Sequence, residues 1–117
     1  MKYVSIVFIL LFSFINAQSQ VNLKVNVIEV SFSSNLNFED LADIKDQLTK
    51  LNINLTYQSL VFREDGQLKN ITFKVDCNDG FNGSAGGKLF KNNKIGFYRD
   101  YTLNADSPFG TGSPHAD

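Results

Sequence analysis

The sequence predicts one small α+β domain in which a single helix packs on a mostly antiparallel sheet, in the order β-α-β-β-β with a further strand possible at the end. Three observations lead to this prediction. A chain of 117 residues allows one modest core. Segments with apolar residues at every second position outnumber the one segment with helical spacing. That helical segment follows the first strand, and a helix placed there covers one face of an antiparallel sheet.

The N-terminus has the three-part layout of a secretory signal. Lys2 provides a basic start, residues 4–15 form an apolar run, and Ala17 precedes a polar stretch. We expect residues 1–17 to be the signal, with cleavage between Ala17 and Gln18, and we expect the chain to be exported to the periplasm or beyond. The apolar run is shorter than the roughly 20 residues of a membrane span, so no span is expected once the signal is removed.

The composition excludes several classes of function. Without the signal, the chain carries ten basic and twelve acidic residues, so its net charge is −2 and no basic excess would attract nucleic acid. Cys77 is the only cysteine, so no intrachain disulfide forms and stability must come from the core. Three glycosylation sequons, at Asn54, Asn70 and Asn82, matter only in a host that glycosylates.

The first strand and the helix are expected in residues 21–52. Alternation in residues 21–32 shifts by one residue at Ile28, which predicts a bulge or a strand covered on both faces at its end. Asn37 is expected to cap a helix with Asp40 in the capping-box position, and Asn52 to end it in a left-handed conformation. One helix face carries an apolar stripe at helical spacing, formed by Leu41, Ile44, Leu48 and Leu51.

The remaining strands alternate with turn signals. Residues 53–57 form a strand that residues 60–63 continue or follow, and Glu64-Asp65-Gly66 predicts a hairpin to a strand at 68–77. Four residues of this last strand should point inward: Ile71, Phe73, Val75 and Cys77. After a turn at 78–80, the glycine-rich residues 80–87 form a loop or a weakened strand. Residues 88–90 and 95–101 are expected to pair as a last hairpin; we therefore place the domain at 18–103 and a flexible tail at 104–117.

No motif in the sequence predicts catalysis, a metal ion or a cofactor. His115 is the only histidine and lies in the predicted tail, where nothing would orient it. The acidic turn that begins at Asp76 lacks the glycine and the glutamate of a calcium-binding EF-hand loop. Gly86-Gly87-Lys88 lacks the first glycine and the Ser/Thr of a phosphate-binding loop. Three carboxylates share the helix face opposite the apolar stripe and fit a solvated surface: Glu39, Asp43 and Asp46.

The best candidates for partner binding lie in the last predicted hairpin. Tyr98, Arg99 and Tyr101 combine aromatic and cationic side chains, which often anchor protein interfaces. The alternative is that the lysines of this hairpin, Lys88, Lys91 and Lys94, protect a sheet edge from unwanted strand pairing.

Residues 38–90 carry a longer pattern. It consists of a helix that starts Glu39-Asp40-Leu41, an Asp65-Gly66 hairpin, the strand Ile71-Thr72-Phe73-Lys74-Val75 and a turn rich in Gly and Ser. This pattern resembles the small exported C-terminal domain of some bacterial membrane metallopeptidases of the beta-lactam-sensor (antirepressor) type. The resemblance implies a bacterial envelope domain that binds or senses. It carries over no catalytic residue, because the zinc-binding helix with two histidines one turn apart is absent.

Together these observations predict a non-enzymatic binding domain of the bacterial cell envelope, whose partner is another envelope protein held by a sheet edge or by residues 95–101. The alternative is a secreted inhibitor or effector of an extracellular enzyme. A hydrolase that uses only carboxylates would need a pocket holding two of them.

Overall fold

The computed structural model describes residues 21–113, which form seven strands and one helix. The α+β class predicted from the sequence is confirmed, and the strands divide into two antiparallel sheets. The expected signal, the Ala17–Gln18 cleavage site and His115 lie outside the described residues. Within residues 21–113, no helix is both long and apolar enough to cross a membrane.

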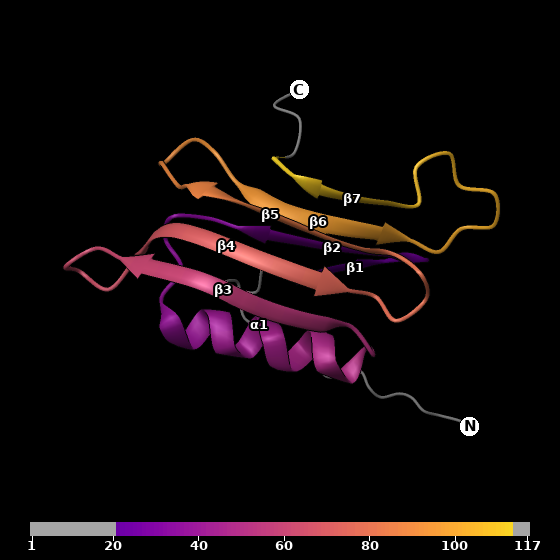
Figure 1. Ribbon diagram of the computed structural model, residues 1–117, viewed down its shortest axis with the longest axis horizontal. Helices are drawn as coiled ribbons and strands as arrows, with labels where there is room; N and C mark the ends of the chain where they lie inside the picture. Colours follow the sequence, from indigo (N-terminus) through magenta and orange to yellow (C-terminus); the bar gives the residue numbers. More distant parts are fainter. Residues whose placement is uncertain (1–20, 114–117) are drawn as a thin grey trace.

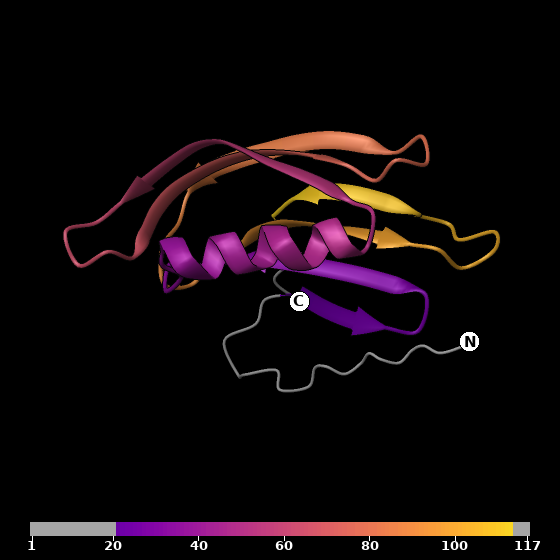
Figure 2. The same cartoon turned by 90° about the horizontal axis from the view of Figure 1, so that it is seen from below.

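A four-stranded sheet forms one layer of the molecule, in the order β1-β2-β6-β7. Its strands are β1 (Val21–Lys24), β2 (Val27–Phe32), β6 (Ile95–Asp100) and β7 (Phe109–Gly112). A three-stranded sheet forms the other layer, in the order β3-β4-β5. Its strands are β3 (Asn54–Phe62), β4 (Leu68–Asp76) and β5 (Asn82–Lys88). Figure 1 shows the two sheets, and Figure 2 shows them as separate layers.

The core lies between the two sheets. The Phe73 ring from β4 packs against Phe32 from β2 and Phe97 from β6, at centroid distances of 5.1 and 6.1 Å. The sequence predicted that one side of the strand at 68–77 points inward. This is confirmed, because Ile71, Phe73, Val75 and Cys77 are all buried. The two layers are thus joined by apolar side chains, in keeping with a domain that has no disulfide.

Helix α1 (Phe38–Lys50) lies beside β3 (Figure 2). Its predicted capping box is present, since the Asn37 side chain accepts from the Asp40 N–H and the Asp40 carboxylate accepts from the Asn37 N–H. Leu41, Ile44 and Leu48 from the predicted stripe are buried, and Asn52 adopts the expected left-handed conformation at φ 65°. The Tyr57 hydroxyl donates to the Leu41 carbonyl at 2.7 Å, which ties the helix to β3.

Two predictions about strand pairing are corrected. The shift of alternation in residues 21–32 is a tight turn between β1 and β2, in which Asn26 has φ 66°, rather than a bulge in one strand. Residues 88–90 and 95–101 do not pair as a hairpin. β5 pairs with β4, whereas β6 pairs with β2 and β7, so residues 89–94 cross from one sheet to the other. Short sequence separation favoured a hairpin, but the pairing with β2 buries the apolar side of β6.

The domain also extends beyond residue 103, where the sequence prediction ended it. Phe109–Gly112 pair with β6, and the Phe109 ring packs against Phe81 at 5.9 Å. The Thr111 hydroxyl donates to the Ser84 carbonyl of β5, so β7 joins the two layers along this side. The sequence did not predict β7 because two of its four residues are glycine, whose β-propensity is low.

Candidate functional site

Arg99 is part of a structural cluster rather than of an exposed surface. Its side chain is only 11% exposed, and its Nε lies 2.9 Å from the Asp79 carboxylate, in the turn between β4 and β5. The guanidinium stacks between the rings of Phe81 and Tyr101, at 4.5 and 4.3 Å from their centroids. We call Asp79, Phe81, Arg99 and Tyr101 the Arg99 clamp. Because Asp79 and Phe81 lie in the turn between β4 and β5 and Arg99 lies in β6, the clamp ties the three-stranded sheet to the four-stranded sheet at this end.

Tyr101 is the outer member of the Arg99 clamp. The residue is 41% exposed, and its backbone N–H donates to the Asn26 carbonyl at 2.6 Å. Partial burial raises the pKa of the Tyr101 hydroxyl, and the negative charge on Asp79 adds to this effect. The stacking on Arg99 gives Tyr101 a structural role that the sequence prediction did not contain.

Tyr98 is the predicted residue that lies on an outer face. It stands opposite Glu29 of β2 on one side and Gly110 of β7 on the other. A Cβ atom at Gly110 would approach the Tyr98 ring to 2.7 Å, so the ring lies over this glycine. The Tyr98 hydroxyl makes a hydrogen bond with the Ser107 hydroxyl, which fixes the ring along the strand.

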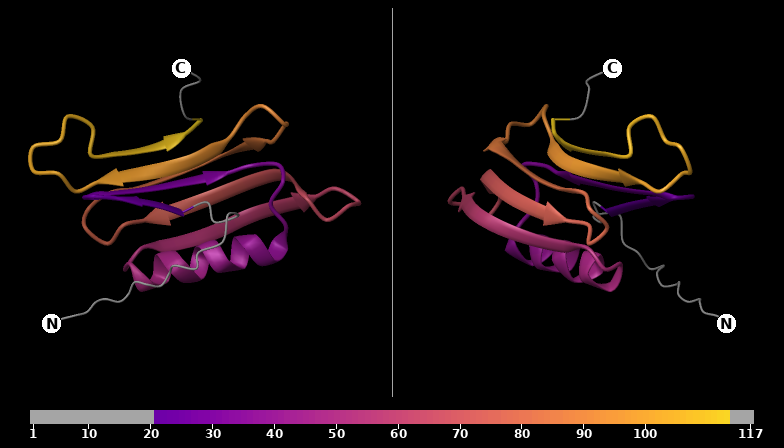
Figure 3. Two further views of the ribbon diagram at one scale, coloured as in Figure 1. Left: turned by 180° about the vertical axis from the view of Figure 1, so that it is seen from behind. Right: turned by 45° about the vertical axis from the view of Figure 1, so that its right-hand side comes forward.

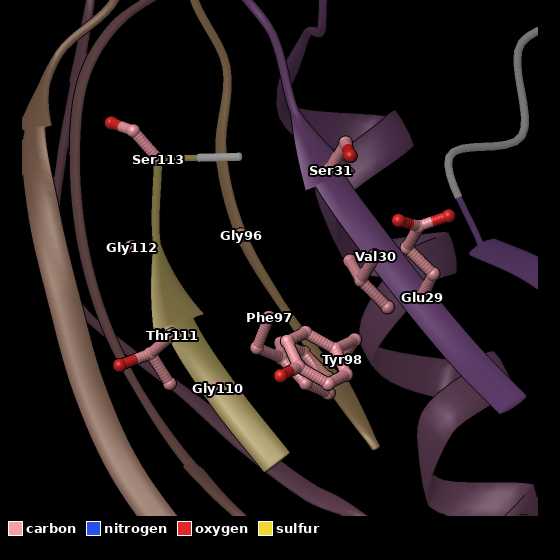
Figure 4. Close-up of a pocket in the computed structure, with 10 residues that line it drawn as sticks. All are labelled: Glu29, Val30, Ser31, Gly96, Phe97, Tyr98, Gly110, Thr111, Gly112 and Ser113. Atoms are coloured by element: carbon pink, nitrogen blue, oxygen red, sulfur yellow. The ribbon is translucent and has the colours of Figure 1, made fainter. Parts of the chain in front are cut away.

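A groove of about 370 Å³ opens on this outer face, next to Tyr98 (Figure 4). Gly96 and Gly112 stand opposite each other across β6 and β7, and Gly110 lies two residues from Gly112. A Cβ at Gly112 would meet no other atom within 4 Å, so the backbone is open there, whereas Gly96 is buried and Gly110 lies under the Tyr98 ring. The groove is lined by Glu29, Val30, Ser31, Gly96, Phe97, Tyr98, Gly110, Thr111, Gly112 and Ser113.

The chemistry of the groove suits binding. Glu29 is the only carboxylate among its lining residues, so no pair of acids is assembled there for hydrolysis. The Glu29 carboxylate lies 3.9 Å from the Lys24 ammonium, and both side chains are largely exposed, so this weak pair leaves Glu29 able to accept hydrogen bonds. The hydroxyls of Ser31 and Ser113 and the ring of Tyr98 add polar and aromatic contacts. Elsewhere in residues 21–113, no three His, Cys, Asp or Glu side chains are placed to hold a metal ion.

Cys77 is buried, as the sequence predicted, with an exposed fraction of 4%. Burial, together with the negative charge on Asp79, raises the pKa of its thiol to about 11. A thiol with such a pKa is almost entirely protonated at neutral pH and is a poor nucleophile or metal ligand.

Sequence reasoning thus found one groove residue, Tyr98, and missed the rest. Glu29 and Ser31 share a face in the alternation of β2, and this signal could have placed them on the outside. The contribution of β7 could not be found, because its pairing was not foreseen. Comparison of the chain with protein-family models, curated proteins and solved structures found no match in any of the three. The resemblance to the metallopeptidase domain therefore stays a prediction.

Proposed function

We propose that this chain is an exported, non-enzymatic binding domain of the bacterial cell envelope, and that it holds an envelope protein in the groove on the outer face of β2, β6 and β7. The observation that carries the proposal is the groove itself, in which open backbone at Gly112, with no atom within 4 Å of its Cβ position, lies in the same groove as the Tyr98 ring. An extended segment of a partner can approach such backbone more closely than it can approach a sheet face covered by side chains.

The lining residues favour a protein partner. Tyrosine contributes a large contact area at a small cost in conformational entropy, and it is enriched at protein interfaces. The Tyr98 ring is already held by Gly110 and by the hydrogen bond to Ser107, so little of its freedom is lost on binding. Glu29 and Ser31 can accept hydrogen bonds from backbone N–H groups or polar side chains of the partner.

The test is to fill the groove without disturbing the core. Ser31 is half-buried on the outer face of β2, so Ser31→Arg places a long side chain across the groove. Thr56→Arg makes the same kind of change on the outer face of β3, in the other sheet. Each immobilised variant is exposed to bacterial envelope extract, and the captured protein is identified and then titrated as a purified protein.

The proposal expects Ser31→Arg to weaken binding of the purified partner by at least tenfold and Thr56→Arg to leave it unchanged. Equal binding by both variants would remove the groove as the site. Tyr98→Phe should retain most of the affinity and Tyr98→Ala should lose it, because the ring supplies contact area and the hydroxyl is bonded to Ser107.

A further inference from the structure

The connection between β5 and β6 is basic and aromatic, and it does not contribute to the groove. It runs Lys88-Leu89-Phe90-Lys91-Asn92-Asn93-Lys94, and no Asp or Glu lies between Asp79 and Asp100. It lies at the end of the molecule where β5 stops and β6 starts, at the opposite end of β6 from the Arg99 clamp (Figures 1 and 3). We call residues 88–94 the basic connection.

The basic connection has a defined shape. The Phe90 N–H donates to the Asn93 side-chain oxygen at 2.6 Å, and the Asn93 amide donates to the Lys88 carbonyl at 3.0 Å. Leu89 is 3% exposed, and its N–H donates to the Lys69 carbonyl at 2.9 Å. Leu89 therefore anchors the connection in the core while its neighbours point outward, and it brings the exposed residue Lys69 alongside.

The outward side chains are not accounted for by contacts within the domain. Phe90 is 56% exposed, and Lys88, Lys91 and Lys94 are all exposed. None of these lysines forms an ion pair with another residue of the described part of the chain. Protection of an edge hairpin cannot explain Lys91 and Lys94, because residues 89–94 cross between sheets instead of turning within one; Lys88, by contrast, ends the edge strand β5.

The positive charge here is local. The expected mature chain has a net charge of −2, and several acidic residues gather at the other ends of the same strands, at Asp76, Asp79 and Asp100. The basic connection is therefore not a sample of a generally basic surface. It is a positive segment on a slightly acidic protein, with an exposed aromatic ring in its middle, and the hairpin between β3 and β4 holds Glu64 and Asp65 at the same end.

We propose that the basic connection docks the protein on an anionic phospholipid surface. Lys88, Lys91 and Lys94 would lie among the headgroup phosphates, and the Phe90 ring would enter the boundary between headgroups and acyl chains. A lipid surface needs no shaped pocket, so the exposed side chains of a short connection suffice for docking. Lysines near such a surface each raise affinity about fivefold. This site is separate from the groove, so the proposal does not depend on the function proposed above.

The test uses the chain without its signal and unilamellar vesicles of phosphatidylcholine with or without phosphatidylglycerol. The proposal expects sedimentation with the phosphatidylglycerol vesicles only, and release by high salt. Lys91→Glu/Lys94→Glu should weaken binding by at least about 25-fold, since two attractive charges are lost. The control Lys45→Glu/Lys74→Glu changes the net charge equally on the helix and on β4, and it should bind nearly as well as the original chain.

Three outcomes would overturn the proposal: no binding to phosphatidylglycerol vesicles, equal loss in both double variants, or binding to soluble polyglutamate that depends on Lys91 and Lys94 while the vesicles are ignored. The last result would identify an acidic protein as the partner. The chain has no tryptophan, so Phe90→Trp gives a specific probe. Its fluorescence should shift to the blue on addition of phosphatidylglycerol vesicles, and an unshifted spectrum with bound protein would contradict entry of this ring.

Discussion

Two basic and aromatic segments lie at the two ends of β6, and they differ in the burial and pairing of their charged side chains. At the end of the strand, Arg99 is nearly buried, paired with Asp79 and stacked between two rings. Before the strand, Lys91 and Lys94 are exposed and unpaired within the described residues, beside the exposed ring of Phe90. In the sequence both segments appeared to be parts of one hairpin surface.

The difference lies in what the rest of the fold brings to each end. The turn between β4 and β5 supplies Asp79 and Phe81 to Arg99, whereas no acidic residue within 21–113 forms an ion pair with Lys91 or Lys94. A guanidinium also stacks and forms directed hydrogen bonds, which an ammonium does less well. Residue type alone therefore did not decide between a structural and a surface role.

Strand β6, which joins these two ends, should be the element whose substitution lowers the free energy of unfolding most. A Cβ at Gly96 would lie 1.9 Å from the Val30 carbonyl oxygen, so Gly96→Ala must separate β6 from β2. We expect a loss of more than about 4 kcal/mol in the free energy of unfolding, or no folded protein, by circular dichroism with urea. Gly80→Ala, at a turn with φ 100° and open space, should cost only about 1 kcal/mol. Similar losses in both would contradict the close approach at Gly96.

Removing the Arg99 side chain should have the next largest effect. Arg99→Ala leaves Asp79 partly buried without its partner and removes two stacking contacts, so we expect a loss of about 2–4 kcal/mol. Lys94→Ala, at the other end of β6, should change the free energy of unfolding by less than about 0.5 kcal/mol. If urea unfolding gave equal losses of free energy for Arg99→Ala and Lys94→Ala, the two ends of β6 would not differ in their contribution to stability. Arg99→Lys should fall between them.

The pH dependence of stability should report on Cys77, whose pKa responds to Asp79 of the clamp. A thiol that titrates near 9 when unfolded and at about 11 when folded keeps its proton longer in the folded chain. The thiol therefore does not lower the free energy of unfolding below pH 9. As the pH rises from 9 toward 11 the free energy of unfolding falls, by at most about 3 kcal/mol.

We expect the free energy of unfolding to fall more between pH 8 and pH 10.5 in the original chain than in Cys77→Ala. Tyr57, whose pKa is also raised by burial, is common to both chains, so their difference isolates the thiol. Parallel curves would mean that Cys77 keeps an ordinary pKa.

Removal of the exposed Phe90 ring should have the smallest effect on stability. Phe90→Ala should change stability by less than about 0.5 kcal/mol, because more than half of this side chain is already in water. Phe81→Ala should cost about 1–2 kcal/mol, because Phe81 packs on Phe109 and on Arg99. Thermal unfolding of the two variants tests this, and a large loss of stability in Phe90→Ala would show that the Phe90 ring is part of the core.

Much of the local structure was predictable. The capping box at Asn37, the left-handed Asn52, the hairpin at Asp65-Gly66 and the inward side of β4 all followed from neighbouring residues. The candidate site was much less predictable. Of three proposed partner residues, only Tyr98 lines the groove, because Arg99 and Tyr101 found structural partners far away in the chain.

The sequence by itself determined the helix, the turns at Asp65-Gly66 and at residues 78–80, the inward face of β4 and the burial of Cys77. These features depend on backbone preferences and on periodicity within a few residues. Only the tertiary structure decided that β6 leaves β5 and pairs with β2, that Phe109–Gly112 complete the sheet, and that Arg99 meets Asp79. Those choices depend on which distant surfaces bury the most apolar area together, and no local pattern contains that information.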